Sequence, residues 1–196
     1  MTYYKFGKFT DEWAGTPNDN VTWVIDGGYL LDDWLVMRLP SSGCEFIDNW
    51  PDSAVVATRY KNRREDMPEA FSNRPIVSDR LRRLIENLDP NAAQYLPVEI
   101  HYRGIPIDGQ YWVANWLQEV DCVDWDRSVP KGKPPKGEHV VFWNTVLDQS
   151  KIPSSFHVFL PTQAVCKAIC SESLKNAIEN SGITGCGFLP LDSRVE

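Results

Sequence analysis

The sequence lacks any apolar run long enough to cross a membrane. Its 196 residues contain no continuous apolar stretch near eighteen residues, and the first thirteen, MTYYKFGKFTDEW, lack the apolar core of a signal peptide. Cysteine is also sparse. The five cysteines are an odd number at irregular spacing, which is not the pattern of a disulfide-linked secreted fold. We therefore expect a cytoplasmic protein with no membrane contact.

Catalytic motifs are missing as well. There is no G-x-S-x-G nucleophile elbow, no G-x-x-x-x-G-K-[ST] phosphate loop, no G-x-G-x-x-G and no H-E-x-x-H. Cys166 and Cys170 are four residues apart, but zinc would need further ligands, such as His157 and Cys186, and there is no second cysteine pair. The sequence favours no metal and no cofactor. A nucleophile–base pair between a cysteine and a histidine remains an alternative, with three candidate bases, His101, His139 and His157.

Clustered positive charge is absent too. The net charge is −7, and residues 1–57 carry nine acids against three bases, while residues 99–128 carry six against two. A phosphate backbone requires clustered Lys and Arg, so we expect no nucleic-acid partner. An acidic face instead suits a basic protein partner, whose approach it would steer, or serves only solubility.

What the sequence does contain is an internal repeat. Residues 77–98, VSDRLRRLIENLDPNAAQYLPV, align without a gap with residues 170–191, CSESLKNAIENSGITGCGFLPL, at a spacing of 93. Seven positions are identical. Three others differ by like-for-like exchange: Asp79/Glu172, Arg82/Lys175 and Tyr95/Phe188. We interpret the two segments as copies of one duplicated unit.

Each copy predicts a helix, a turn and a strand. Ser78 and Ser171 are placed as N-caps, while Asp89-Pro90 ends the first helix and Gly182 ends the second. In the first copy an apolar stripe recurs at helical spacing at Leu81, Leu84, Ile85 and Leu88. Helices of three turns are marginal alone, so each stripe must pack on a sheet, and we expect the two copies to share one.

Short strand candidates surround the copies. They lie at residues 3–9, 21–25, 34–39, 54–58, 98–102, 111–116, 139–147 and 156–160, and the pair at 98–102 and 111–116 predicts a hairpin. The fold class we expect is α+β, with a mixed, largely antiparallel sheet and few helices, built around two related helix-turn-strand units. We expect a β-rich N-terminal region, 1–74, that packs on the rest, and an α+β region, 75–196, that contains the repeats 77–98 and 170–191.

Tryptophans beside acids are the candidate partner contacts. Most of the eight tryptophans should lie in the core, but Trp is also enriched at binding hot spots. The segment 121–128, DCVDWDRS, lacks the spacing, Gly and Glu of a calcium loop. In an extended chain Asp124 and Asp126 would share one face, with Val123 and Trp125 on the other. We predict partner contacts at Asp32, Asp33, Trp34, Asp121, Asp124, Trp125 and Asp126.

Five segments in order carry a family resemblance. They are the first repeat, YWVAN at 111–115, DCVDWDRS at 121–128, LDQSKIP at 147–153 and the second repeat. Together they resemble the eleventh family of bacterial polymorphic-toxin immunity proteins. Its pattern has a Ser-led helix with an LPV strand, a tyrosine-rich hairpin, an acidic D-x-x-D-x-[DE]-x-S segment, an LD-x-SKIP turn and a closing Ser-led helix and strand. The resemblance covers about residues 75–191.

The resemblance implies a protein without catalytic residues, encoded beside a toxin that it binds and blocks. The shared motifs look like scaffold, since toxin-contacting surfaces of immunity proteins vary with the toxin. With the acidic segments, this favours a non-enzymatic immunity protein that meets its cognate toxin through an acidic, Trp-bearing surface. The alternatives are a small enzyme with a Cys/His pair and a sensor module with a small-ligand pocket.

Overall fold

Most strands in the described part of the chain pair antiparallel, and two helices accompany them there. The computed structural model describes residues 2–7, 21–25, 29–30, 44–48, 50, 54–58, 65–68, 70–71, 74–131, 140–162, 164 and 168–191, and of 21–25, 29–30, 57–58 and 70–71 it describes only the backbone. The predicted α+β class is confirmed. Within these ranges no helix is both long and apolar enough to span a membrane.

The first repeat folds as a split β-α-β unit. Strand β6 (Arg74–Ser78) leads into helix α2 (Asp79–Leu88), and the chain then enters β7 (Ala93–Tyr102). A third strand, β9 (Tyr111–Trp116), lies between β6 and β7 and is antiparallel to both. The two strands that flank the helix in sequence are therefore parallel but not adjacent.

The second repeat has the same arrangement. It consists of β14 (Ala168–Ser171), α3 (Glu172–Asn180) and β15 (Gly187–Pro190). Its central strand is β1 (Tyr3–Gly7), which is antiparallel to both β14 and β15. In the first unit the central strand follows along the chain, whereas in the second it comes from the other end of the sequence.

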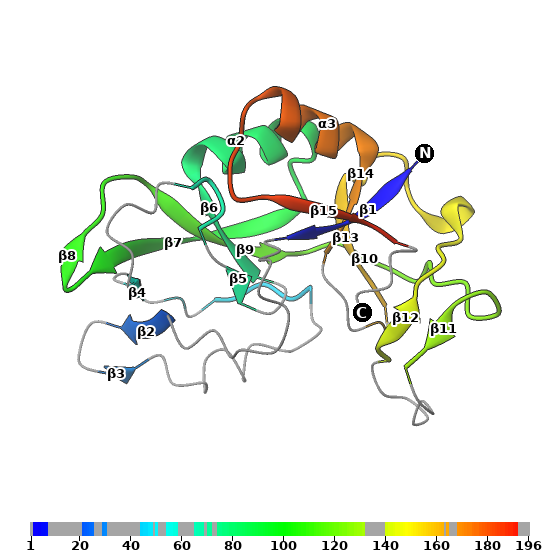
Figure 1. Ribbon diagram of the computed structural model, residues 1–196, viewed down its shortest axis with the longest axis horizontal. Coiled ribbons are helices and arrows are strands. Elements are labelled where there is room, and N and C mark those ends of the chain that lie inside the picture. Colours follow the sequence, from blue (N-terminus) through cyan, green and yellow to red (C-terminus); the bar gives the residue numbers. More distant parts are fainter. Residues whose placement is uncertain are drawn as a thin grey trace.

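The two units belong to two different sheets, so the expectation that they share one is wrong. The second unit lies in a five-stranded sheet of order β10-β13-β14-β1-β15, and the first in a sheet of order β3-β2-β4-β7-β9-β6-β5, with β8 paired to β7. Each unit has its own central strand, so each forms a sheet of its own. The helices come together instead: α2 and α3 lie against each other on one side of both sheets (Figure 1).

The remaining strands are short. They are β2 (Val21–Ile25), β3 (Tyr29–Leu30), β4 (Ala54–Thr58), β5 (Ala70–Phe71), β8 (Ile105–Pro106), β10 (Glu119–Val120), β11 (Val129–Pro130), β12 (Phe142–Asn144) and β13 (Val158–Pro161). The predicted strands at 21–25 and 54–58 are confirmed, and those at 139–147 and 156–160 are shorter than predicted or shifted. The candidate at 34–39 lies outside the described residues. The predicted hairpin forms, but β9 pairs with residues 93–98, while residues 99–102 pair in parallel with β4.

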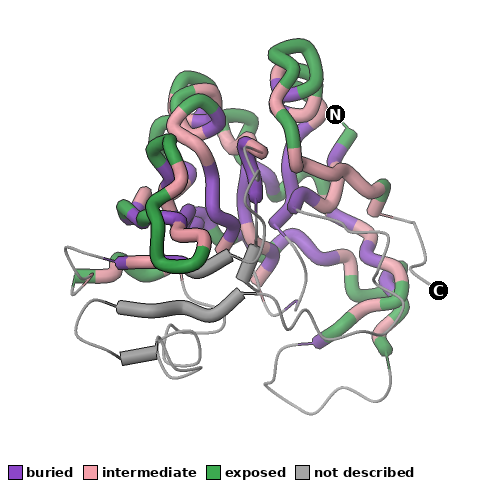
Figure 2. Tube along the Cα trace, turned by 60° about the vertical axis from the view of Figure 1, so that its left-hand side comes forward, coloured by how far each residue is buried: buried purple, intermediate pink, exposed green. Residues whose placement is uncertain are grey.

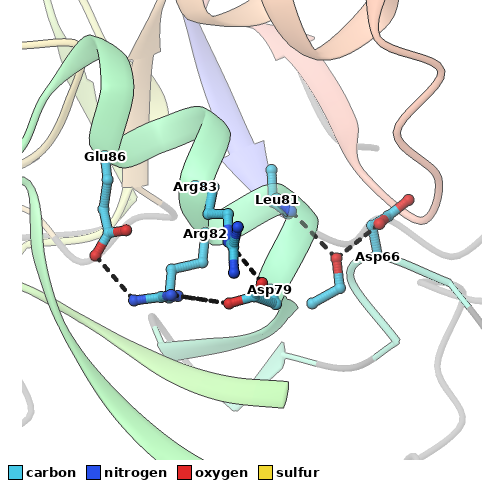
Figure 3. Close-up of polar contacts among 7 residues, drawn as sticks. Asp66, Asp79, Leu81, Arg82, Arg83 and Glu86 are labelled. Atoms are coloured by element: carbon cyan, nitrogen blue, oxygen red, sulfur yellow. Dashed lines mark hydrogen bonds and ion pairs between the residues drawn. The ribbon is translucent and has the colours of Figure 1, made fainter. Parts of the chain in front are cut away.

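Both helices begin at the predicted serine N-caps. The Ser78 hydroxyl accepts a hydrogen bond from Leu81 N (3.2 Å) and donates one to the carboxylate of Asp66 (2.6 Å). Figure 3 labels these two partners, Leu81 and Asp66. Ser171 accepts from Leu174 N (3.2 Å), and its hydroxyl lies 2.8 Å from Nδ1 of His157. Asp66 and His157 thus hold equivalent places in the two units.

These two N-cap partners also join the units to each other. The Asp66 carboxylate accepts from Thr184 N (3.0 Å), in the turn after α3. His157 N donates to the carboxylate of Asp89 (2.7 Å), at the end of α2. Each unit's cap partner therefore contacts the turn that ends the other unit's helix, which makes the pair an approximate two-fold repeat.

A cation–aromatic cluster is duplicated as well. Arg82 bonds to Asp79 at 2.8 Å and to Glu86 at 3.3 Å (Figure 3), and Lys175 bonds to Glu179 at 2.7 Å. In each unit, the cation also lies over two aromatic rings, one on the unit's central strand (β9 or β1) and one on the strand that follows the helix (β7 or β15). The distances to ring centroids are 4.6 Å to Trp112 and 6.0 Å to Tyr95 for Arg82, and 5.3 Å to Tyr4 and 5.8 Å to Phe188 for Lys175.

One core lies beneath both helices. The buried stripes are Leu81 and Ile85 of α2 with Leu174 and Ile178 of α3. They belong to a single apolar cluster that also contains Phe6 of β1 and Trp116 of β9. Figure 2 shows the buried residues in the interior and the exposed ones along the outer helix faces and loop ends. The core holds the two units as one scaffold.

Candidate partner-binding surface

The acidic segment 121–128 forms a tight turn and not the amphipathic strand expected from its alternation. Asp124 accepts hydrogen bonds from Arg127 N (3.1 Å) and Arg127 Nε (2.6 Å), and Ser128 N closes the turn onto Asp124 O (2.9 Å). The hydrogen bond from the Arg127 side chain lowers the pKa of the Asp124 carboxyl. Because the chain turns here, Val123 is buried while Trp125 is exposed, so these two residues do not share a face.

This turn is held against the segment 144–148. The Ser128 hydroxyl accepts from Val146 N (2.9 Å), and Asp148 N donates to Cys122 O (2.7 Å). Asp148 in turn caps the short 3-10 helix Gln149–Lys151, accepting from Ser150 N (3.1 Å) and the Ser150 hydroxyl (2.6 Å), and these bonds lower the pKa of Asp148. The acidic motif at 121–128 and the LDQSKIP motif at 147–153 therefore stabilise each other's backbone conformation.

Three of the four predicted contact residues in this segment are exposed. Asp121, Trp125 and Asp126 face solvent, and the Trp125 side chain is 42 % exposed. The fourth, Asp124, is half-buried and occupied with Arg127. Asp124 acts in the scaffold of the turn, while its neighbours are available to a partner. The other predicted contacts, Asp32, Asp33 and Trp34, lie outside the described residues.

Beside this turn lies a small antiparallel pair of strands, β11 and β12, which we call the ribbon (residues 129–131 and 141–144). Trp125 packs edge-to-face on Phe142 of the ribbon, with ring centroids 5.1 Å apart. The ribbon adds three exposed apolar side chains that the sequence analysis did not single out: Val129 (50 % exposed), Val141 (44 %) and Trp143 (44 %). The run VVFWN at 140–144 has the composition of a buried strand, so no sequence signal marked it as surface.

A groove of about 650 Å³ separates the ribbon's base from the N-terminal strand. Its walls include Tyr4, Arg127, Asn144 and Asp148. The side-chain oxygen of Asn144 is buried and has no hydrogen-bond partner among the described residues. This groove would be the place for a ligand in the sensor alternative.

Three of the described thiols, Cys44, Cys122 and Cys170, do not have the character of nucleophiles. Burial raises the pKa of Cys44 to about 11 and that of Cys122 to about 12, and it raises the pKa of Cys170 as well. A reactive cysteine needs the opposite shift. His157 is hydrogen-bonded to the Ser171 cap, and His101 lies 2.7 Å from Glu99.

Cys166, a candidate zinc ligand, and His139, a candidate catalytic base, lie outside the described residues. In the described part of the chain, no three His, Cys, Asp or Glu side chains gather as metal ligands would. The geometry that stands out here is an exposed aromatic surface beside carboxylates, held rigidly by backbone hydrogen bonds.

Comparison with known proteins agrees with the family resemblance. No curated protein matches the chain. The model of the immunity protein family Imm11 matches residues 3–193, and so includes the N-terminal third, where the sequence shows none of the family's motifs. A match over nearly the whole chain shows that this protein belongs to the immunity protein family Imm11.

Proposed function

We propose that this protein is a non-enzymatic inhibitor that binds one cognate bacterial toxin and neutralises it in the cytoplasm of the cell that makes both. Membership of an immunity protein family carries the proposal. The polar motifs of the 121–128 turn, which are engaged in hydrogen bonds within the fold, support a scaffold that acts by binding.

The contact surface we propose is the 121–126 turn. Trp125 is exposed beside the carboxylates of Asp121 and Asp126, and the turn is fixed by its hydrogen bonds to segment 144–148. A rigid exposed Trp loses little conformational entropy when it is buried, which is why Trp is common among hot-spot residues. The flanking carboxylates suit a toxin surface that is basic, such as one that would otherwise bind nucleic acid.

The test is co-expression with the toxin module encoded by the neighbouring gene. Cells that make the toxin should survive when this protein is present, and the two should co-purify. Trp125→Ser should weaken the complex by about 30-fold or more, as expected for a buried hot-spot Trp. Ile105→Ser is the control, since Ile105 is 68 % exposed on β8, far from the ribbon. No complex and no rescue by the wild-type protein would end the proposal.

Salt dependence tests the role of the acidic side chains. If Asp121 and Asp126 face a basic surface, raising the salt concentration should slow association, because exposed charges more than a Debye length apart are screened. Asp126→Lys should slow association further and reduce its salt dependence. Association that does not change with salt would instead indicate an apolar interface without electrostatic steering.

A further inference from the structure

The ribbon has apolar side chains on both of its faces. The register of the pair shifts between Val129 and Pro130, which face Asn144 and Phe142, but exposure still alternates along β12: Trp143 is exposed, whereas Phe142 and Asn144 are half-buried. Phe142 therefore lies on one side of β12 and Trp143 on the other. Trp125 packs against Phe142 and therefore lies on that first side. On the second side, Trp143 is 44 % exposed and Val141, two residues earlier, is equally exposed.

This two-sided exposure is unusual for a sheet. An antiparallel pair at the edge of a domain normally buries one face and presents a polar one to water. Here the Phe142 side is only half-buried, beneath the exposed Trp125, and on the other side Val141 and Trp143 are exposed. The ribbon lies at the end of the molecule opposite β8 (Figure 1). Four of the seven large apolar side chains that are exposed in the described residues lie on or beside it: Trp125, Val129, Val141 and Trp143.

The ribbon is nevertheless well held at its base. At the base, the Ser128 hydroxyl bridges the chain to Val146, and at the far end Lys131 N donates to Val141 O (2.7 Å). Val123 and Leu147, just behind the ribbon, form an antiparallel bridge and are both buried. The exposed rings are thus presented on a preformed support, which lowers the entropic cost of binding.

The two faces also differ in charge. Asp121 and Asp126 are exposed carboxylates of the same turn as Trp125, whose ring packs on the Phe142 side. On the other side, the ammonium of Lys131 lies 4.5 Å from the centroid of the Trp143 ring. A partner that covered both faces would meet negative charge on one and positive charge on the other.

We infer that the ribbon inserts as a wedge into a cleft of the toxin, so that both faces are covered. The toxin's cleft has a basic wall facing Asp121 and Asp126, and an acidic or aromatic wall facing Lys131 and Trp143. A flat toxin surface would cover only one face and leave the opposite Trp in water. This inference rests on the proposed function, since it names how the same partner is bound, and it adds the Val141–Trp143 side to the contact surface.

The test compares the two faces. Trp143→Ser and Lys131→Glu alter only the second face, and Trp125→Ser alters the first, with Ile105→Ser as the control. Affinity for the neighbouring toxin module is measured by calorimetry, and circular dichroism checks that each variant is folded. We expect Trp143→Ser to weaken binding at least tenfold, Lys131→Glu to weaken it measurably, and Ile105→Ser to leave it unchanged.

Fluorine NMR supplies a second measurement, which detects contact with each Trp side chain directly and does not depend on a substitution weakening the complex. In protein labelled with 5-fluorotryptophan, the signals of residues 125 and 143, assigned with Trp→Phe variants, should both shift and lose their solvent isotope effect when the toxin module is added. The buried Trp116 signal should stay in place. If only the residue 125 signal responds and Trp143→Ser binds like wild type, the toxin docks on one face and the wedge is wrong, while the proposed function stands. If no complex forms at all, both proposals fall.

Discussion

At the scale of single residues, the Ser78 hydroxyl makes two hydrogen bonds, and different substitutions remove one or both of them. It caps α2 through Leu81 N, and it donates to Asp66, whose carboxylate also holds Thr184. Ser78→Ala should destabilise the protein by about 1–3 kcal/mol, since the cap is lost and the largely buried Asp66 loses a donor. Ser78→Thr, which keeps the hydroxyl, should remain within about 1 kcal/mol of wild type.

Ser78→Asp is the informative case. Aspartate is as good an N-cap as serine, but here it would place a second carboxylate against Asp66. We expect this variant to be less stable than Ser78→Ala at pH 7 and to regain stability as the pH falls towards 4. The repulsion between the two carboxylates disappears when the introduced aspartate is protonated, so lower pH favours the folded state. Urea unfolding at pH 7 and pH 5 measures this, and a variant as stable as wild type at pH 7 would contradict the Asp66 contact.

Cys44 tests the enzyme alternative. Its side chain is only partly buried, yet burial and the charge of Glu119 raise its pKa to about 11. Only a small fraction is thiolate at pH 7, so iodoacetamide should modify Cys44 slowly, with a rate that rises about tenfold per pH unit up to about pH 10. The more deeply buried Cys122 and Cys170 should react later still. Peptide mapping by mass spectrometry measures each site, and rapid labelling of any cysteine at pH 7 would favour a nucleophilic thiol.

At the scale of elements, the segment 65–68 connects the two units, since Asp66 bonds to both Ser78 and Thr184. This segment passes so close to Gly185 that a side chain there would collide with it. Gly185 has φ +79°, and a Cβ there would lie 2.5 Å from the carbonyl oxygen of Met67. Gly104 has nearly the same φ, +78°, with nothing within 4 Å of a Cβ. Gly104→Ala should therefore cost about 1 kcal/mol from backbone strain alone, whereas Gly185→Ala should cost about 3 kcal/mol or more. Chemical denaturation of both variants measures the difference in the free energy of unfolding. Equal losses would mean that segment 65–68 can move away from residue 185 without loss of stability.

The helices and their ends could be predicted from the sequence because their signals are local. A serine cap, an apolar stripe and a terminating Asp-Pro or Gly act within one or two turns of chain, and α2 and α3 obey them. The turn at 124–127 was missed because alternation of Asp with Val and Trp resembles a strand. The competing hydrogen bonds of Asp124 to Arg127 decide the geometry, and they depend on the tertiary support from Val146.

The exposed ribbon could not be predicted for a related reason. An apolar run such as VVFWN is ordinarily buried, and its exposure depends on what the rest of the chain leaves uncovered. At the candidate surface, therefore, the sequence identified the exposed Trp125, Asp121 and Asp126, but it did not separate them from the structural Asp124 and did not identify Trp143.

At the scale of the whole molecule, the division into two sheets was the main feature that the sequence did not disclose. The repeat is visible in residues 77–98 and 170–191, but each copy is completed by a strand outside it. Tyr4 pairs with Pro190 as Trp112 pairs with Pro97, so β1 is the counterpart of β9, at a distance in sequence that no local pattern reveals. Long-range pairing of this kind is set by which strand can bury its apolar face in the shared core, where Phe6 stacks on Phe188 at 5.6 Å.

If β1 is the counterpart of β9, the chain should tolerate a new connection that makes the second unit resemble the first. Strand β15 ends at Pro190, opposite Tyr4, so a hairpin loop of about four residues can join Leu191 to Thr2, with new termini opened within residues 8–20. Closing so short a loop costs little entropy, and the permuted protein should keep the wild-type circular dichroism and a thermal midpoint within about 5 °C of wild type.

The matched control begins at residue 21 and omits residues 1–20 altogether. It leaves β14 and β15 without their central strand and removes Phe6 from the core, so it should bind a hydrophobic dye and melt without cooperativity. A truncated chain as stable as the permuted one would show that β1 is dispensable, and the two-fold account of this fold would then be wrong.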